Sequence, residues 1–290
     1  MDGKRKTPQV LIIYEALAKR KVLSSIDQKR YQRLKCGYDG ELLFDTFVQA
    51  QHTSFYVLHD LQLMFNDRFC QIDSVLLANN TMYIFEVKNY AGEYYFDHDA
   101  LCMGDQVEIE NPINQRNGTE SLVRSFLQFH GYDIVVKAYI IFINPQCTVF
   151  HTPVDKQLLF YSNLKRFLLK LATNSHITQL DTQFSELLQA SHNITHSYQQ
   201  IPNYQCQELQ KGVTCQHCGS FSFKITYSQV QCQECQQTEV VQCTILRHIE
   251  EFCFLFPFEK LTTKTIYEWC DGRIAVKRSS RITQVFSQEK

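Results

Sequence analysis

The sequence predicts an α/β protein, with a mixed sheet flanked by helices and a smaller cysteine-containing module towards the C-terminus. Three observations predict this class. Apolar and β-branched runs broken by turn residues occupy residues 55–96, as expected of strands. Stretches with helical periodicity precede and follow these runs. Two Cys-x-x-Cys pairs lie between residues 215 and 235.

Composition narrows the class of protein further. A chain of 290 residues with 44% hydrophobic and 20% charged residues is long enough and apolar enough for two or three folded domains. The formal net charge of −1 excludes a protein that binds polyanions through its overall charge. Basic residues outnumber acidic ones in residues 1–35 and 260–290, so nucleic acid would be contacted at particular surfaces. For the N-terminal segment, solvated helix faces are the alternative.

The N-terminal part is expected to be helical. Residues 5–35 carry an apolar patch at helical spacing, formed by Val10, Leu11, Ile13, Tyr14 and Leu17. We expect a loop from Gly37 to Gly40, followed by an apolar core helix with Glu41 in its first turn.

Strands are expected at residues 55–63, 70–78, 82–89 and 92–96. The second and third form a hairpin, because they flank Asn79-Asn80, a residue pair that tolerates positive φ. Asp73 stands near the start of the first hairpin strand. Glu86 and Lys88 lie two residues apart on the second strand, so their side chains project from the same face.

Two carboxylates and a lysine that converge at a hairpin are typical of a metal-dependent phosphodiesterase site. The oxygens of Asp73 and Glu86 would bind Mg²⁺, and Lys88 would stabilise charge or orient the attacking water. The alternative is a solvated strand face, which is common for an isolated Glu-x-Lys. The apolar neighbours of these acids favour the metal site, because burying a carboxylate among them costs several kcal/mol unless it is paired.

The next elements complete the expected α/β core. Residues 115–132 should form a helix with Leu122, Phe126 and Phe129 on one face. The apolar run at residues 135–143 suits a buried strand, and residues 158–171 suit an amphipathic helix.

Four motifs in chain order carry a family resemblance. They are Gly37-Tyr-Asp-Gly40-Glu41, Asp73, Glu86-Val-Lys88 and Asn111-Pro-Ile-Asn-Gln115. The set resembles the nuclease-related domain (NERD) family of the PD-(D/E)xK nuclease superfamily over about residues 35–150. The resemblance implies a restriction-endonuclease-like core that uses Mg²⁺ or Mn²⁺ held by Asp73 and Glu86. It also implies catalytic roles for Glu41 at the metal, for Lys88, and for Gln115, which would orient water or phosphate.

The cysteine pairs predict a structural zinc site. Cys215 and Cys218 form the first pair, and Cys232 and Cys235 follow after thirteen intervening residues. Two such knuckles supply four thiolates for tetrahedral zinc in a zinc ribbon, and they leave no coordination position open for water. Disulfides or merely buried thiols are the alternatives.

The expected compartment argues against disulfides. The first six residues are strongly charged, and the apolar run Val10–Ile13 is too short for a signal peptide. No stretch is long and apolar enough to cross a membrane. We therefore expect a cytoplasmic protein, of bacterial origin, whose twelve cysteines are reduced.

The C-terminal residues suggest a helix-turn-helix. Residues 261–270 form a helix candidate with Thr262 or Thr263 as N-cap, Asp271-Gly272 makes a turn, and residues 276–286 form a second, basic helix. Three basic residues of this helix are expected to contact phosphates: Lys277, Arg278 and Arg281. The alternative is a helical hairpin that caps the ribbon.

These expectations combine into a metal-dependent nuclease that acts on DNA rather than RNA, with the ribbon and C-terminal helices binding nucleic acid or a protein partner. The alternative is a nucleic-acid-binding or scaffold protein, in a DNA-processing or defence assembly, whose nuclease core is inactive. The expected division is a basic helical segment, a nuclease core, a linker, a zinc ribbon and a helix-turn-helix-like segment, at residues 1–35, 36–188, 189–207, 208–245 and 246–290.

Overall fold

The computed structural model describes most of the chain: residues 4–51, 55–98, 100–104, 107–192 and 201–273. The chain divides into two compact units. Residues 1–6 and 33–196 form the first, which we call the nuclease unit after the family that its sequence resembles. Residues 7–32 and 197–290 form the second, the ribbon unit. The finer division into five segments remains a prediction.

A five-stranded mixed sheet forms the centre of the nuclease unit, as predicted. Its order is β1-β2-β3-β7-β9. The first three strands are antiparallel, and β7 and β9 run parallel to β3. The bounds are Tyr56–Phe65 for β1, Arg68–Ala78 for β2, Thr81–Lys88 for β3, Val135–Phe142 for β7 and Leu158–Phe160 for β9.

The predicted hairpin is confirmed. Ala78 pairs with Thr81 across a two-residue turn, and Asn79 and Asn80 have φ values of 55° and 54°. Positive φ at both turn residues matches the right-handed twist of the flanking strands, which fixes the register of β2 against β3.

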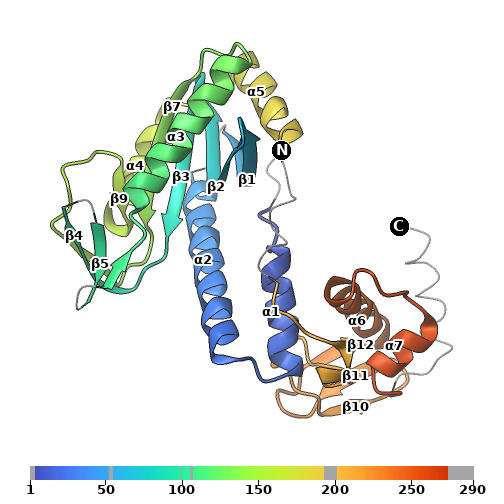
Figure 1. The fold of residues 1–290 in the computed structure, drawn as a ribbon. Coiled ribbons are helices and arrows are strands. Elements are labelled where there is room, and N and C mark those ends of the chain that lie inside the picture. The colour runs from blue at the N-terminus through green and yellow to red at the C-terminus, as the bar shows by residue number, and fades with distance from the viewer. Residues whose placement is uncertain (1–3, 52–54, 99, 105–106, 193–200, 274–290) are drawn as a thin grey trace. The chain divides into compact units, whose positions relative to one another are not determined.

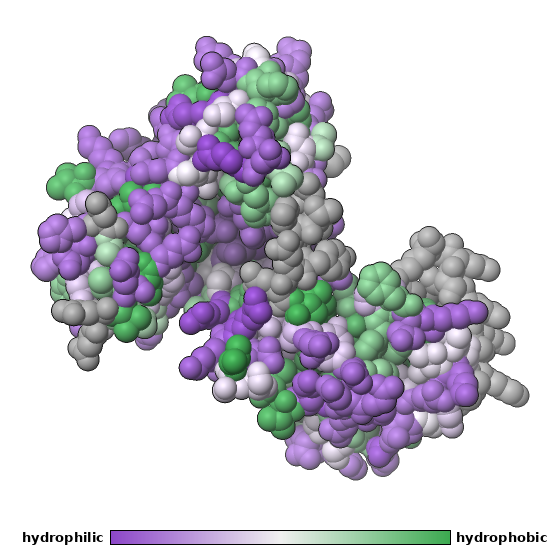
Figure 2. All heavy atoms as spheres, in the orientation of Figure 1, coloured by the Kyte–Doolittle hydropathy of each residue, from purple (hydrophilic) through white to green (hydrophobic). Residues whose placement is uncertain are grey.

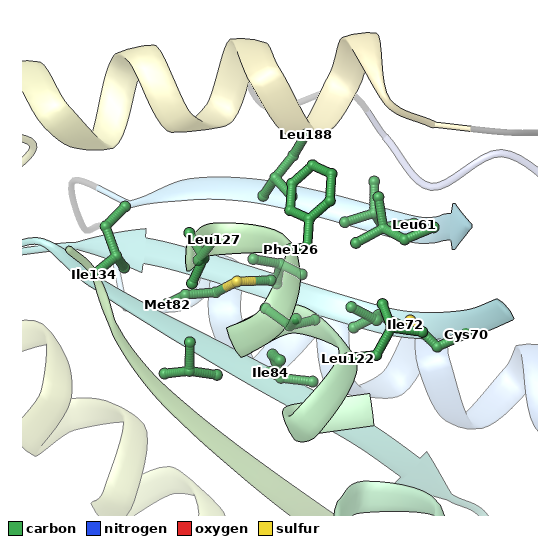
Figure 3. Close-up of a cluster of buried hydrophobic side chains, with 14 of the residues drawn as sticks. Leu61, Cys70, Ile72, Met82, Ile84, Leu122, Phe126, Leu127, Ile134 and Leu188 are labelled. Carbon is green, nitrogen blue, oxygen red and sulfur yellow. The ribbon is translucent and has the colours of Figure 1, made fainter. Parts of the chain in front are cut away.

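Helices cover both faces of this sheet (Figure 1). On one face lie α3 (Pro112–Phe129) and α5 (Gln179–Ala190), and on the other lie α2 (Ser25–Gln49) and α4 (Tyr161–Thr173). Side chains alternate along β3 accordingly: Met82 and Ile84 join the cluster under α3, and Phe85 and Val87 join the cluster under α2. Figure 3 shows this side of the core, where Leu122, Phe126 and Leu127 of α3 and Leu188 of α5 meet the strands.

A second, smaller sheet follows β3 in the same unit. Its order is β6-β5-β4-β8, with bounds Val107–Ile109, Ala100–Met103, Gly92–Asp97 and Cys147–Phe150. Tyr94, Phe96 and Leu101 of this sheet pack against Ile140 and Phe142 at the end of β7. The helix expected at 158–171 begins later, at Tyr161, because Leu158–Phe160 first extend along β7 as β9.

The prediction of a loop from Gly37 to Gly40 is wrong. Helix α2 runs without interruption from Ser25 to Gln49, and both glycines lie inside it. Gly40 serves close packing instead. A β-carbon at Gly40 would lie 2.5 Å from Cβ of Asn89, the residue after β3, so only glycine allows the helix this approach.

The ribbon unit has its own core. Helices α1 (Gln9–Arg20), α6 (Val241–Leu255) and α7 (Thr263–Trp269) surround a buried cluster that includes Leu17, Ile245, Ile249 and Trp269. A three-stranded antiparallel sheet joins them, with β10 (Phe223–Ile225), β11 (Gln229–Cys232) and β12 (Thr238–Val240) in that order, and a short 3₁₀ turn, η2 (Cys206–Glu208), precedes it.

Helix α7 was predicted from the sequence, and α6 was not. The Thr262 hydroxyl accepts a hydrogen bond from the Thr265 N–H at 3.0 Å and caps α7, as expected. The second helix expected at residues 276–286 lies outside the described residues.

No helix in the described ranges is long and apolar enough to cross a membrane. On the face shown in Figure 2, hydrophilic and intermediate residues predominate and hydrophobic ones are scattered among them. Scattered apolar side chains of this kind are normal for a protein surface in contact with water.

Candidate active site and zinc centre

The candidate active site begins with a break in two neighbouring strands. The β1–β2 ladder pairs His59 with Ser74 and Leu61 with Ile72, and it skips Asp60 and Asp73. Asp60 has a φ of 50°, in the left-handed region. The break changes the alternation of side chains, because Ile72 and Val75 lie in the same buried cluster although they are three positions apart, an odd offset that puts side chains on opposite faces of a regular strand.

Asp73 stands where β2 leaves β3. The β2–β3 ladder ends at Ser74 opposite Phe85, one residue short of Asp73. Beyond this point the Asp73 carboxylate, rather than a backbone carbonyl of β2, is the hydrogen-bond acceptor for β3: its Oδ2 accepts from the Val87 N–H at 2.7 Å. This bond places Asp73 directly beside the strand segment that carries Glu86 and Lys88.

Glu86, Lys88 and Gln115 form a hydrogen-bonded group. Lys88 Nζ donates to Glu86 Oε1 at 2.6 Å and to Gln115 Oε1 at 2.9 Å. Glu86 and Lys88 share one face of β3, and Gln115 lies in the first turns of α3, which packs on that face. Pro112 at the start of α3 and the Asn111 side chain, which accepts from the Ile113 N–H at 2.9 Å, set where this helix begins.

Glu41 reaches the same region from α2. It follows Gly40, whose contact with Asn89 brings the helix against the end of β3. Two hydrogen bonds fasten this approach: Asn89 Nδ2 donates to the Cys36 carbonyl at 2.8 Å, and the Cys36 thiol donates to the Asn89 carbonyl at 3.2 Å. The Gly37–Glu41 motif therefore acts through packing of a continuous helix.

One residue of this site, Arg5, was not predicted from the sequence. Its buried guanidinium donates to Glu41 Oε2 at 2.8 Å and to the Asp73 backbone carbonyl at 2.9 Å. It also pairs with Asp45, with Nε at 2.8 Å from Oδ2 and Nη2 at 3.1 Å from Oδ1. No sequence signal distinguishes Arg5, because it stands in the run Lys4-Arg5-Lys6, which is typical of a solvated segment.

Burial and mutual repulsion raise the pKa values of two acids of the site, Asp73 and Glu41. Removal from water, together with the charges of Glu86 and Glu41, raises the pKa of Asp73 well above its usual range. Burial also raises the pKa of Glu41 to about 7, although the nearby Arg5 guanidinium opposes the rise. For Lys88, burial alone would lower the pKa, but the Glu86 carboxylate outweighs it and the pKa is raised.

The three carboxylates offer suitable donors for a hard divalent cation. Protein hydrogen bonds occupy Oε2 of Glu41, Oδ2 of Asp73 and Oε1 of Glu86. Within the described part of the chain, the second oxygen of each accepts no hydrogen bond. Oxygen donors with excess negative charge are those that Mg²⁺ and Mn²⁺ prefer, and a cation would relieve the repulsion between them.

Comparison with known protein families agrees with this geometry. The family model described as "nuclease-related domain" (NERD) matches residues 36–143, which include α2 from Cys36 onward, the hairpin and α3. The chain carries a nuclease-related domain. The comparison with curated proteins returns no match, and neither does the comparison with solved structures.

Outside the nuclease-related domain, the structure brings the four predicted cysteines together. The sulfurs of Cys215, Cys218, Cys232 and Cys235 all lie within 4.8 Å of one another. Two of the separations, Cys215 to Cys235 and Cys218 to Cys232, are 3.6 Å. Four sulfurs at the usual Zn–S distance of about 2.3 Å stand about 3.8 Å apart in a tetrahedron, so the cluster fits a zinc ion.

The two knuckles share one backbone pattern. In the first, the Cys215 N–H donates to the Ser220 carbonyl at 2.8 Å, and Gly219 adopts a φ of 73°. In the second, the Cys232 N–H donates to the Gln237 carbonyl at 2.9 Å, and Gln236 adopts a φ of 61°. Backbone N–H groups of Cys235 and Glu234 lower the pKa of the Cys232 thiol to about 7, whereas hydrogen bonds to neighbouring thiols raise the pKa values of Cys218 and Cys235. A bound cation would favour the thiolate form at all four positions.

The basic residues expected to bind nucleic acid, Lys277, Arg278 and Arg281, lie outside the described residues.

Across the residues that are described, the cysteines are the one group of three or more candidate metal ligands whose atoms all lie within 4.8 Å of one another. The carboxylates of the nuclease-related domain are neighbours but are not drawn together to that extent.

Proposed function

We propose that the nuclease-related domain hydrolyses phosphodiester bonds of nucleic acid, DNA in preference to RNA, with the help of a divalent metal ion. The observation that carries this proposal is the arrangement around Lys88. Its ammonium group bridges Glu86 and Gln115, while Asp73 binds the backbone between Glu86 and Lys88. This places two metal-binding acids, a cation and an amide in one small region.

In this proposal Asp73 and Glu86 hold Mg²⁺ or Mn²⁺, with Glu41 completing the shell of acids. When bound, the metal supplies Lewis-acid stabilisation of the charge on the phosphoryl oxygens. The free second oxygens of the three carboxylates are the atoms available for it.

Lys88 acts as a fixed cation rather than as a base. Its raised pKa keeps the ammonium group protonated at neutral pH. Of its three N–H groups, two are taken by Glu86 and Gln115. The third has no acceptor among the described residues and is available to the attacking water or a phosphate oxygen. Gln115 accepts from Lys88 through Oε1, so its amide N–H groups can donate to the same water or phosphate.

The zinc site is proposed to be structural, and the C-terminal basic segment to bind nucleic acid or a protein partner. If Lys277, Arg278 and Arg281 each bind a phosphate, replacing one of them should reduce the slope of log affinity against log salt by about 0.7–0.9. A salt titration of DNA affinity for the wild type and the triple alanine variant tests this assignment. An unchanged slope would mean that the segment packs on the ribbon or faces a protein partner.

The direct test of the proposed function is a cleavage assay. The full-length protein is incubated with single-stranded DNA, double-stranded DNA and RNA, with Mg²⁺, with Mn²⁺ or with a chelator. We expect cleavage that requires the metal and is fastest on DNA. Binding of nucleic acid without cleavage under every metal condition would support the alternative, an inactive nuclease-related domain that serves as a binding or scaffold module.

A further inference from the structure

Arg5 has no free hydrogen-bond donor. A guanidinium group offers five N–H bonds, and each has an acceptor here. Nε and one N–H of Nη2 bind Asp45, the other N–H of Nη2 binds Ser74 Oγ at 2.6 Å, and the two N–H groups of Nη1 bind Glu41 Oε2 and the Asp73 carbonyl. Arg5 therefore cannot bind a substrate phosphate without giving up one of these partners.

We propose that Arg5 is a positioning residue of the candidate active site, which holds Glu41 and Asp73 at fixed places relative to one another. This inference rests on the proposed function, because it assigns Arg5 a part in a metal site. Arg5 would act through these two acids and would not itself touch the substrate.

The guanidinium has two sides with different tasks. The side formed by Nε and Nη2 anchors the group, through the paired contact with the buried Asp45 and the bond to the buried Ser74. The planar, bidentate fit to a carboxylate fixes the orientation of the whole group. Nη1 consequently points at Glu41 and Asp73 with little freedom to move.

The break in the β-sheet explains why Asp73 needs this contact. At Asp60 and Asp73 the β1–β2 ladder is interrupted. The Asp73 carbonyl accepts from Arg5 instead, at 2.9 Å. A hydrogen bond from a rigid, buried group substitutes for the missing strand contact and fixes the backbone of a proposed metal ligand.

The contact with Glu41 has a second effect. Arg5 occupies Oε2 and leaves Oε1 unoccupied within the described residues. The Glu41 carboxylate is thus oriented by one oxygen and available through the other. Supporting groups that orient metal ligands in this way change metal affinity or activity by about 10–100-fold when they are replaced.

Arg20 provides a matched control. It is also a buried arginine, with a bidentate partner, Glu251, at 2.6 Å and 3.1 Å and further bonds to the Gln210 and Gly212 carbonyls. All these partners belong to the ribbon unit, and none is a proposed metal ligand. Arg20→Lys therefore reproduces the loss of a buried, forked ion pair without touching the candidate active site.

The experiment measures Mn²⁺ binding by electron paramagnetic resonance, DNA cleavage and thermal unfolding, for the wild type, Arg5→Lys and Arg20→Lys in the full chain. Lysine keeps the charge but cannot span four acceptor residues. We expect Arg5→Lys to weaken Mn²⁺ binding at least about tenfold and to lower kcat by a similar factor. Arg20→Lys should leave both unchanged.

Ser74→Ala is a second test of the proposal, for the case in which Arg5→Lys does not fold. It removes one anchoring bond and no charge, so it should fold and weaken Mn²⁺ binding by a smaller factor, about twofold to threefold. If Arg5→Lys and Ser74→Ala both bind Mn²⁺ and cut DNA like the wild type, Arg5 is only structural and the proposed function stands. Tighter Mn²⁺ binding by Arg5→Lys would show that Arg5 competes with the metal. If the wild type neither binds Mn²⁺ nor cuts, the proposed function fails and the role of Arg5 fails with it.

Discussion

The two candidate metal sites of this protein are built in opposite ways. The ribbon site takes its four thiolates from two short knuckles with the same backbone hydrogen bonds, and its sulfurs already lie within 4.8 Å of one another. The candidate active site, which we call the nuclease site after the proposed function, takes its acids from α2, β2 and β3. Each acid has one oxygen held by the protein and one that accepts no hydrogen bond from the described residues. The first arrangement is closed and suits structure, whereas the second is open and suits chemistry.

The difference also appears in what holds each site together. The ribbon knuckles are local: each is completed within six residues of chain. The nuclease site depends on contacts between residues 36 to 69 positions apart, through Arg5 and its four partners. Loss of metal should therefore unfold the first site and only empty the second, and four predictions test this contrast.

The largest effect is expected from Cys232→Ser. Zinc binding to such sites is worth about 10–16 kcal/mol and is coupled to folding, so this change should release zinc and unfold the ribbon unit while the nuclease unit stays folded. Elemental analysis should find one zinc per wild-type chain, and limited proteolysis with circular dichroism should locate the loss of structure. Cys243→Ser, at an exposed cysteine of α6, is the control. A metal-free variant with a protease-resistant ribbon unit would overturn the contrast.

The next effect concerns Lys88. Lys88→Ala removes a fixed cation from the nuclease site. It should raise the activation free energy by about 2.7–4 kcal/mol, which lowers kcat about 10²–10³-fold, with little change in folding or DNA affinity. Single-turnover cleavage and a binding titration separate these quantities. Lys137→Ala changes an exposed lysine on the neighbouring strand β7 and should cut normally. Equal rates for both variants would remove Lys88 from the site.

A third prediction concerns the acid stability of the ribbon unit. Burial lowers the pKa of His248 from 6.5 to about 4, so between these pH values the unfolded chain binds a proton that the folded chain excludes. The stability from this group is complete above pH 6.5 and is lost as the pH falls to about 4, roughly 3 kcal/mol in total.

His248→Gln should remove this pH dependence. A glutamine can accept from the Thr214 N–H and donate to the Thr244 carbonyl, as His248 does at 2.9 Å and 2.7 Å, without titrating. Protonation of the zinc thiolates affects both proteins alike, so the difference between their unfolding free energies from pH 7 to pH 4.5 isolates His248. If the free energies of unfolding of the two proteins fall equally from pH 7 to pH 4.5, the histidine does not titrate in this range.

The smallest effect compares two glycines of α2. Gly40→Ala should destabilise the nuclease unit by about 1–3 kcal/mol, because the new β-carbon would lie 2.5 Å from Cβ of Asn89. Gly37→Ala has no atom within 4 Å of the new β-carbon and should stabilise the helix by about 0.5–1 kcal/mol. Chemical denaturation measures both. If both variants change the free energy of unfolding in the same direction, the contact with Asn89 is not the reason for a glycine at position 40.

The sequence alone determined the parts of this protein that depend on neighbouring residues. Alternation and the Asn79-Asn80 turn predicted the hairpin, and the Cys-x-x-Cys spacing predicted the zinc cluster. The sequence predicted Thr262 or Thr263 as the N-cap of this helix, and Thr262 is the cap of α7. Such signals are readable because strand alternation, turn chemistry and knuckle geometry each span only a few residues.

Only the tertiary structure decided the arrangement of the nuclease site. The left-handed Asp60, the contact that requires Gly40 and the five bonds of Arg5 all arise between elements that are distant in the chain. The two glycines that the sequence suggested were a loop lie inside a continuous helix, and one of them, Gly40, packs against Asn89. Contacts of this kind have no period and no characteristic spacing, because they are set by how folded elements meet rather than by the local preferences of any residue.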